Sequence, residues 1–249
     1  MELARIIAVR NNKTVYRNGD KTLKVFDTFY SKADVLNEAL NQAKIEETGL
    51  NIPKILEVTM IDGKWVIVSE HIKGETLSGL MKKNPGKKNE YLGQFLDLQL
   101  EVHSKACEGL IRLKDKMKLK ISKTDLPATV RYDLLARLEE MPEQGRLCHG
   151  DFIPNNVVIT DDKKPYIIDW SHASRGDAAA DAAHTYLFFR LNGDDETANK
   201  YLDLFCEKSN LTKQYVRKWI PIVAASQTVK GNAFEREFLN AWIDAVDYE

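Results

Sequence analysis

A short segment between residues 149 and 170 constrains the fold more than any other part of the chain. It holds two apolar runs, Val157–Thr160 and Tyr166–Ile168, joined by polar residues. Short apolar runs around a polar connection predict a β-hairpin. Asn156 stands directly before the first run and Asp169 directly after the second. Because the two outer ends of a hairpin lie side by side, we expect these two side chains to direct their oxygen atoms toward the same place.

The residues before this hairpin add a third side chain with a chemical role. The chain reads His149-Gly150-Asp151, and Asn156 follows five residues after the aspartate. Phosphoryl transfer needs a carboxylate beside the attacking hydroxyl and oxygen ligands for the magnesium ion on the phosphates. Asp151 suits the first task, and Asn156 and Asp169 suit the second. The order and spacing of these residues therefore indicate a phosphoryl-transfer site.

Each of these side chains, taken alone, has an ordinary structural explanation. Asp151 could cap a turn, Asn156 could form an Asx-turn, and Asp169 could be a loop residue. The functional interpretation is favoured by the combination of His-Gly-Asp, an asparagine at a fixed distance, and an apolar strand that ends in Asp-Trp.

This combination resembles the catalytic pattern of the aminoglycoside phosphotransferase and choline kinase family. Gly176–Asp181 is similar to the family's next segment, with Ala178 where proline is usual, and the resemblance covers roughly residues 5–190. It implies an α+β, protein-kinase-like two-lobe fold. It also implies transfer of the γ-phosphate of ATP, with Mg²⁺, to a hydroxyl of a small molecule: an aminoglycoside, an amino alcohol or a sugar.

The resemblance also implies roles for residues in the N-terminal part. Lys24, on the third predicted strand, would pair with the α- and β-phosphates, and Glu38, fourteen residues on, would hold Lys24 in position. Backbone groups from Glu70 to Ile72 would bind the adenine edge. Without the resemblance, Lys24 could be a snorkelling edge residue and Glu38 a solvated helix residue.

Three features depart from the family pattern. The loop expected to cover the phosphates, Val9–Thr14, contains no glycine, although glycine normally lets backbone amides approach phosphate closely. Position 153 is Ile where many relatives carry His. Gly150 takes the place of the arginine in the His-Arg-Asp loop of protein kinases. The third feature favours a constitutively assembled small-molecule kinase over a regulated protein kinase.

The sequence pattern changes from strands to helices near residue 72. Before this point we expect one helix, Ser31–Glu47, and five strands: Arg5–Val9, Thr14–Arg17, Thr22–Phe26, Ile55–Met60 and Lys64–Glu70. After it we expect helices at Leu77–Lys83, Tyr91–Lys105, Ala128–Glu140 and from Ala178 to Val246. We therefore predict a nucleotide-binding lobe over residues 1–72 and a catalytic and substrate-binding lobe over residues 73–249.

Charge and cysteine content limit the partners of the chain. The 36 basic and 37 acidic side chains nearly cancel, which gives no reason to expect nucleic acid or an anionic membrane as a partner. The three cysteines form no Cys-x-x-Cys pair, so we expect reduced thiols in a cytoplasmic protein. The N-terminus shows no signal-peptide pattern, and no apolar run approaches the ~20 residues of a membrane span.

Two charged regions bear on the acceptor. Residues 105–125 carry seven basic and three acidic side chains, which we interpret as a solvated helix face and loop rather than a binding patch. From Ser171 to the end, twelve acidic residues stand against nine basic ones. This excess would suit a cationic acceptor, but three charges are too few to decide.

A second class of function stays open, that of a nucleotide-binding regulatory pseudokinase without turnover. The glycine-free loop favours it, whereas the intact set of Asp151, Asn156 and Asp169 speaks against it. A protein kinase is a third and weaker candidate.

Overall fold

The computed structural model describes residues 5–10, 12–229 and 232–243. These residues form two compact units. The first unit comprises the described residues up to Pro85 together with Pro154–Ser171, and the second comprises Gly86–Ile153 together with the described residues from His172 onward. The chain therefore returns to the first unit for the hairpin segment.

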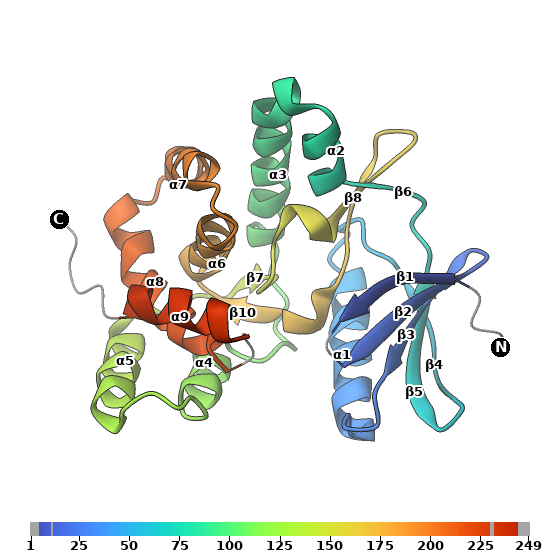
Figure 1. Cartoon of the computed structure of the whole chain (residues 1–249), viewed down its shortest axis with the longest axis horizontal. Helices are drawn as coiled ribbons and strands as arrows, with labels where there is room; N and C mark the ends of the chain where they lie inside the picture. Colours follow the sequence, from blue (N-terminus) through green and yellow to red (C-terminus); the bar gives the residue numbers. More distant parts are fainter. Residues whose placement is uncertain (1–4, 11, 230–231, 244–249) are drawn as a thin grey trace. The chain divides into compact units, whose positions relative to one another are not determined.

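The first unit is built on a five-stranded antiparallel sheet with the order β1-β2-β3-β5-β4 (Figure 1). Its strands are β1 (Arg5–Arg10), β2 (Lys13–Asn18), β3 (Lys21–Phe26), β4 (Ile55–Ile61) and β5 (Lys64–Glu70). Asp62 and Gly63, with φ of 49° and 75°, form the turn between β4 and β5. All five predicted strands are confirmed to within one residue at each end.

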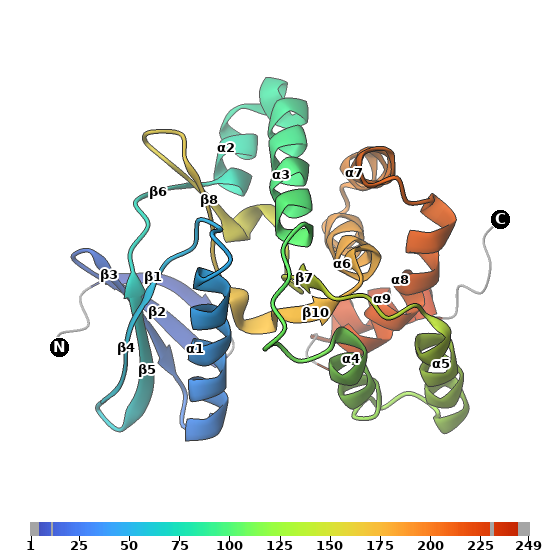
Figure 2. The ribbon, with the colours of Figure 1, turned by 180° about the vertical axis from the view of Figure 1, so that it is seen from behind.

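A single helix, α1 (Lys32–Glu46), packs against one face of this sheet (Figures 1 and 2). The Ser31 hydroxyl accepts a hydrogen bond from the backbone N–H of Asp34, and the Asp34 carboxylate accepts one from the backbone N–H of Ser31. This reciprocal capping box satisfies two N–H groups at the start of the helix, which therefore begins at Lys32, one residue after the predicted start at Ser31.

The sheet carries apolar side chains on both faces. The cluster on the α1 side consists of Phe26, Val35, Ala39 and Ile67. The cluster on the other side consists of Leu23, Val25, Val66 and Val68. Because successive side chains of a strand alternate between faces, Lys24 shares the helix-covered face with Phe26.

A small three-stranded sheet with the order β6-β8-β9 completes the first unit. It comprises β6 (Gly74–Thr76), β8 (Val157–Thr160) and β9 (Pro165–Ile167), with α2 (Leu77–Lys83) after β6 and a short 3₁₀ helix (Pro154–Asn156) before β8. The predicted hairpin is confirmed, although its second strand lies one residue earlier than expected. The predicted boundary at residue 72 marks the place where strands give way to helices in the sequence. The compact units divide the chain differently, since residues 73–85 and Pro154–Ser171 belong to the first unit.

The second unit is mainly helical. Its elements are α3 (Lys88–His103), α4 (Leu113–Ile121), α5 (Ala128–Glu140), α6 (Ala178–Leu191), α7 (Asp195–Ser209), α8 (Lys213–Gln227), α9 (Ala233–Ile243) and the paired strands β7 (Arg146–Cys148) and β10 (Ser174–Gly176). Helix α8 packs against α4, α5, α6, α7 and α9, and its Trp219 and Ile222 side chains are fully buried. It therefore forms the centre of this unit.

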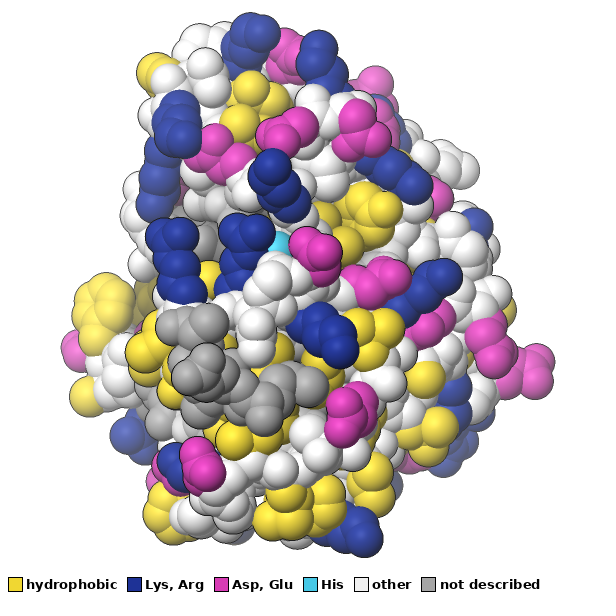
Figure 3. Space-filling model, turned by 90° about the vertical axis from the view of Figure 1, so that its right-hand side faces the viewer, with side chains coloured by type: hydrophobic (Ala, Val, Ile, Leu, Met, Phe, Trp, Pro, Cys, Tyr) yellow, Lys and Arg dark blue, Asp and Glu magenta, His cyan; other side chains and the backbone are white. Residues whose placement is uncertain are grey.

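The surface mixes both signs of charge. On the face shown in Figure 3, basic and acidic side chains are interspersed, with hydrophobic ones between them. Among the described helices, none is long and apolar enough to cross a membrane. Among the described residues, Cys107, Cys148 and Cys206 form no disulfide bond.

Candidate functional site

Lys24 forms the centre of an ion-pair cluster in the first unit. Its Nζ lies 2.6 Å from Oε1 of Glu38 and 2.9 Å from Oδ1 of Asp169. The three residues come from β3, α1 and the loop after β9, so the fold brings them together from distant parts of the chain. Glu46 of the same helix instead accepts the backbone N–H of Ile55 at 2.7 Å. The predicted pairing of Lys24 with Glu38 is thus present, and Asp169 joins it.

The Lys24 ammonium is held in its charged form. Burial alone would lower the pKa of Lys24, but the carboxylates of Asp169 and Glu38 outweigh burial and raise this pKa above its usual value. A second cation, Lys13, lies with its Nζ 2.8 Å from Oε2 of Glu38. Lys13 belongs to the glycine-free segment Val9–Thr14, in which Asn11 lies outside the described residues. This segment therefore adds a positive charge to the cluster.

The hairpin joins Asn156 to the residue that precedes Asp169. The backbone N–H of Ile168 donates to the backbone oxygen of Asn156 at 2.9 Å. Asp169 has a φ of 62°, in the left-handed region, and its Oδ1 accepts a hydrogen bond from the Ser171 hydroxyl at 3.1 Å. An amide oxygen and a carboxylate at adjoining chain ends fit Mg²⁺, which takes one or two protein ligands and completes its shell with phosphate oxygens and water.

Glu70 and Ile72 lie at the end of β5 and just beyond it. The backbone N–H of Glu70 donates to the Lys54 oxygen at 3.0 Å, and the Glu70 carboxylate accepts the Lys54 N–H at 3.1 Å. The next residue, His71, donates its backbone N–H to the Asp20 oxygen at 2.8 Å. The N–H groups of Glu70 and His71 are thus bonded within the protein, and the contact of this segment with adenine stays a prediction.

Asp151 lies in the second unit, on a loop that the Asp181 carboxylate anchors. Asp181 accepts hydrogen bonds from the backbone N–H groups of His149 at 3.1 Å and Gly150 at 2.7 Å, and it lies 3.0 Å from Nε2 of His103. Burial alone would raise the pKa of Asp181, but the hydrogen bond from His103 and the nearby histidine charges lower it to about 2. Sequence reasoning missed Asp181, although this residue ends the segment used for the family resemblance.

Gly150 gives this loop a shape that other residues cannot adopt. Its φ is 77°, and a Cβ added there would lie 2.4 Å from the backbone oxygen of His172. The next N–H, that of Asp151, donates to Nδ1 of His149 at 3.2 Å. A larger residue such as the arginine of protein kinases therefore has no room at position 150.

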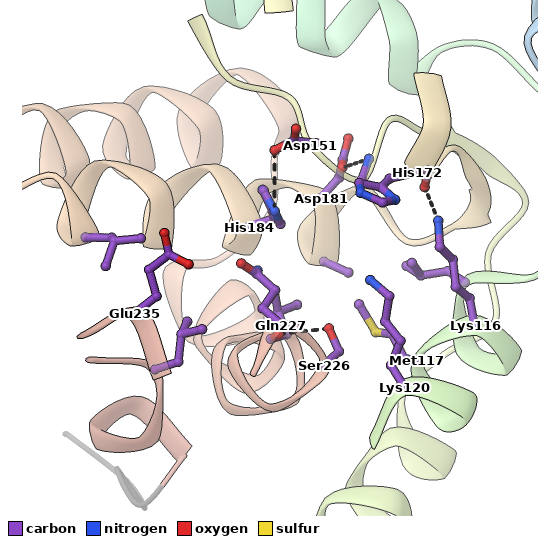
Figure 4. Close-up of a pocket in the computed structure, with 16 residues that line it drawn as sticks. Lys116, Met117, Lys120, Asp151, His172, Asp181, His184, Ser226, Gln227 and Glu235 are labelled. Atoms are coloured by element: carbon purple, nitrogen blue, oxygen red, sulfur yellow. Dashed lines mark hydrogen bonds and ion pairs between the residues drawn. The ribbon is translucent and has the colours of Figure 1, made fainter. Parts of the chain in front are cut away.

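A cavity of about 210 Å³ opens beside Asp151 (Figure 4). Nε2 of His184, on α6, lies 3.8 Å from Oδ1 of Asp151 at the wall of this cavity. Burial lowers the pKa of His184 to about 4; the Asp181 charge opposes this shift, and the Lys120 and Lys116 charges add to it. His184 is therefore neutral at neutral pH.

Lys116 and Lys120 of α4 also line the cavity (Figure 4). Lys120 extends from the helix into the cavity, and the Lys116 ammonium donates to the backbone oxygen of His172. The interpretation of residues 105–125 as a solvated face holds for Lys118, which is exposed. It is wrong for these two lysines, which face inward.

Comparison with known proteins connects these residues to a family. The sequence profile described as "Phosphotransferase enzyme family" matches residues 3–217. No curated protein matches the chain by sequence.

Solved structures with a similar fold include two aminoglycoside phosphotransferases and a choline kinase. APH(4)-Ia is 17% identical with a TM-score of 0.70, covering 98% of this chain and 93% of that chain. Aminoglycoside-3'-phosphotransferase of type VIII is 17% identical with a TM-score of 0.68, covering 91% and 94%. Choline kinase LicA from Streptococcus pneumoniae is 14% identical with a TM-score of 0.64, covering 98% and 92%.

These structural similarities confirm the predicted α+β, protein-kinase-like fold. The profile match covers most of the sequence, including every residue assigned to the candidate site. The chain therefore belongs to the phosphotransferase enzyme family.

Proposed function

We propose that the chain transfers the γ-phosphoryl group of ATP to a hydroxyl group of a small molecule. The observation that carries this proposal is the contact of Lys24 with both Glu38 and Asp169. Kinases of this fold class need a lysine held for the phosphates and an aspartate held for the metal. Two solved neighbours add support: a mutant of APH(4)-Ia bound to ADP and hygromycin B, and LicA bound to AMP.

In this proposal the first unit binds the nucleotide. Lys24 pairs with the α- and β-phosphates, and Glu38 holds its ammonium in place. The backbone oxygen of Glu70 and the N–H of Ile72 bind the adenine edge. We also propose that the protein acts in the cytoplasm, which fits three cysteines without a Cys-x-x-Cys pair.

Asn156 and Asp169 would hold Mg²⁺ through an amide oxygen and a carboxylate oxygen. When bound, the ion neutralises the charge of the phosphate oxygens. Asp169 keeps one side of its carboxylate toward Lys24 at 2.9 Å, so contacts within the protein align the lysine and the aspartate.

Asp151 acts on the acceptor in the second unit. It orients the acceptor hydroxyl and accepts its proton as the hydroxyl oxygen bonds to the γ-phosphorus. The bond between this phosphorus and the β–γ bridging oxygen breaks, which releases ADP and leaves a phosphate ester. His184, neutral and 3.8 Å from Asp151, adds no competing positive charge to the carboxylate.

The test is a screen of small alcohols, hydroxy acids, sugars, sugar phosphates and aminoglycosides for ATP consumption with Mg²⁺. Phosphorylation of at least one acceptor is expected. ATP binding without transfer to any acceptor would instead favour a regulatory pseudokinase. The glycine-free segment Val9–Thr14 is the sequence feature that favours this alternative.

The metal assignment has its own test. Asp169→Ala should abolish the magnesium-dependent part of the thermal stabilisation that ATP confers. A ligand that binds only the folded state stabilises it by an amount that grows with the logarithm of ligand concentration over Kd, so a weaker magnesium–ATP complex gives a smaller shift. An unchanged magnesium-dependent shift would contradict the assignment.

A further inference from the structure

The cavity beside Asp151 receives two cations from one helix. Lys116 and Lys120 stand four residues apart on α4, and residues at this spacing share a helix face. The buried Leu113 and Met117 lie on the same side and also line the cavity. By contrast, Lys118 of the same helix is exposed. The helix therefore turns one pair of lysines toward the cavity and Lys118 toward solvent.

Two of the acidic side chains at this cavity form hydrogen bonds within the protein. Asp181 is fully buried and accepts the backbone N–H groups of the Asp151 loop. Glu235, near the start of α9, accepts the backbone N–H of Asn232 at 3.2 Å and so caps its own helix. Asp151 is the carboxylate assigned to the reacting hydroxyl. The described part of the lining thus holds three carboxylates against two lysines, but Asp181 and Glu235 already accept backbone N–H groups and Asp151 is assigned to the reaction.

The cavity also lacks the usual receptor for a quaternary ammonium. Such cations are recognised by cages of aromatic side chains, and none of the described residues that line this cavity is Phe, Tyr or Trp. The positive charges of Lys120 and Lys116 act on His184 at the cavity wall, where they help to lower its pKa.

We infer that the acceptor carries an anionic group, a carboxylate or a phosphate, as well as its hydroxyl, and that Lys120, assisted by Lys116, binds that group. This inference rests on the proposed function, because it places the hydroxyl at Asp151. The cavity of about 210 Å³ is smaller than the ~300–1,000 Å³ of drug-sized ligand sites. A short-chain or single-ring hydroxy acid or sugar phosphate fits this volume and charge.

The test measures binding without nucleotide to four matched probes: glycerate, glycerol phosphate, glycerol and aminopropanediol. The two anionic probes should bind more tightly than the neutral and cationic ones. The ratio of the affinities for glycerate and glycerol phosphate distinguishes a carboxylate site from a phosphate site. Lys120→Gln should weaken the anionic probes by about 10-fold or more, since a hydrogen bond to a charged group is lost. Binding of glycerol should not change. Lys118→Gln, on the exposed side of the helix, is the matched control and should change none of the four.

Any of the following results would overturn the inference: no binding of either anionic probe to the unaltered protein, unchanged affinity in Lys120→Gln, or tightest binding of the cationic probe. If Lys120→Gln weakened glycerol binding as much as binding of the anionic probes, Lys120 would only shape the cavity, and the inference would also be overturned. Because ATP is absent from the measurement, a failure to find phosphoryl transfer would count against the proposed function alone.

Discussion

Lys24 contacts two carboxylates, so its charge holds together residues from three separate elements. Lys24→Met keeps an unbranched side chain of similar size and removes the charge that Glu38 and Asp169 share. We expect kcat/KM for ATP to fall by roughly 10²-fold or more, because a positioned group that stabilises phosphate charge is lost. Lys21→Met, at the exposed start of the same strand, is the control and should stay within a few-fold. Equal values for the two variants would contradict the role of Lys24.

His184 makes the stability of the chain depend on pH. Its pKa is about 4 in the folded protein against 6.5 in a free side chain, so between these values the unfolded chain binds a proton that the folded chain does not. Stability should therefore fall as pH drops from 6.5 to about 4, by at most about 3 kcal/mol. The 17% of the side chain that is exposed reduces this figure.

The comparison is urea unfolding of His184→Gln and the unaltered protein between neutral pH and about pH 4. The glutamine variant cannot titrate, so its stability should fall less over this range. Parallel pH profiles would show that His184 is not held neutral by the fold.

At the scale of elements, the loop from β7 to Asp151 depends on a single glycine. Gly150→Ala would place a Cβ 2.4 Å from the His172 backbone oxygen at a φ of 77°, so we expect a loss of about 1–3 kcal/mol of stability and a large loss of turnover. Gly93→Ala, inside α3 with nothing within 4 Å, is the matched control. It should be neutral or stabilise by up to about 1 kcal/mol. Thermal melting of both variants tests this, and similar losses would contradict it.

Local signals explain why most elements could be predicted. The capping box of Ser31 and Asp34 and the turn at Asp62-Gly63 are short sequence patterns, and the structure shows both. Helix α4 (Leu113–Ile121) received no predicted boundaries, because lysines occupy four of its nine positions and mask its apolar stripe. Which lysines face inward is decided by packing on α8, and no local pattern encodes that contact.

At the scale of the whole molecule, the candidate site combines segments far apart in sequence. The hairpin geometry predicted that Asn156 and Asp169 would be neighbours, because both lie within one local element. The contact of Lys24 with Asp169 spans 145 positions, and here only the family resemblance pointed to Lys24. The anchoring of the Asp151 loop by Asp181 was not predicted, since an aspartate inside a helix resembles any solvated residue until its neighbours are known.

Asp151 is the residue on which the proposed reaction depends. Asp151→Asn keeps the shape of the side chain and removes its charge and basicity. Turnover of the best acceptor should fall by roughly 10²- to 10⁴-fold, the usual contribution of a positioned acid–base group. ATP affinity should be nearly unchanged, since Lys24, Asn156 and Asp169 are retained. Asp161→Asn, in the exposed turn of the hairpin, is the control and should behave as the unaltered protein.

The decisive measurement is therefore the rate of phosphoryl transfer by Asp151→Asn under saturating ATP, together with its ATP affinity. A large fall in rate with retained affinity is the predicted result. A rate within a few-fold of the unaltered protein would show that Asp151 is not the residue that accepts the proton, and it would contradict the proposed reaction.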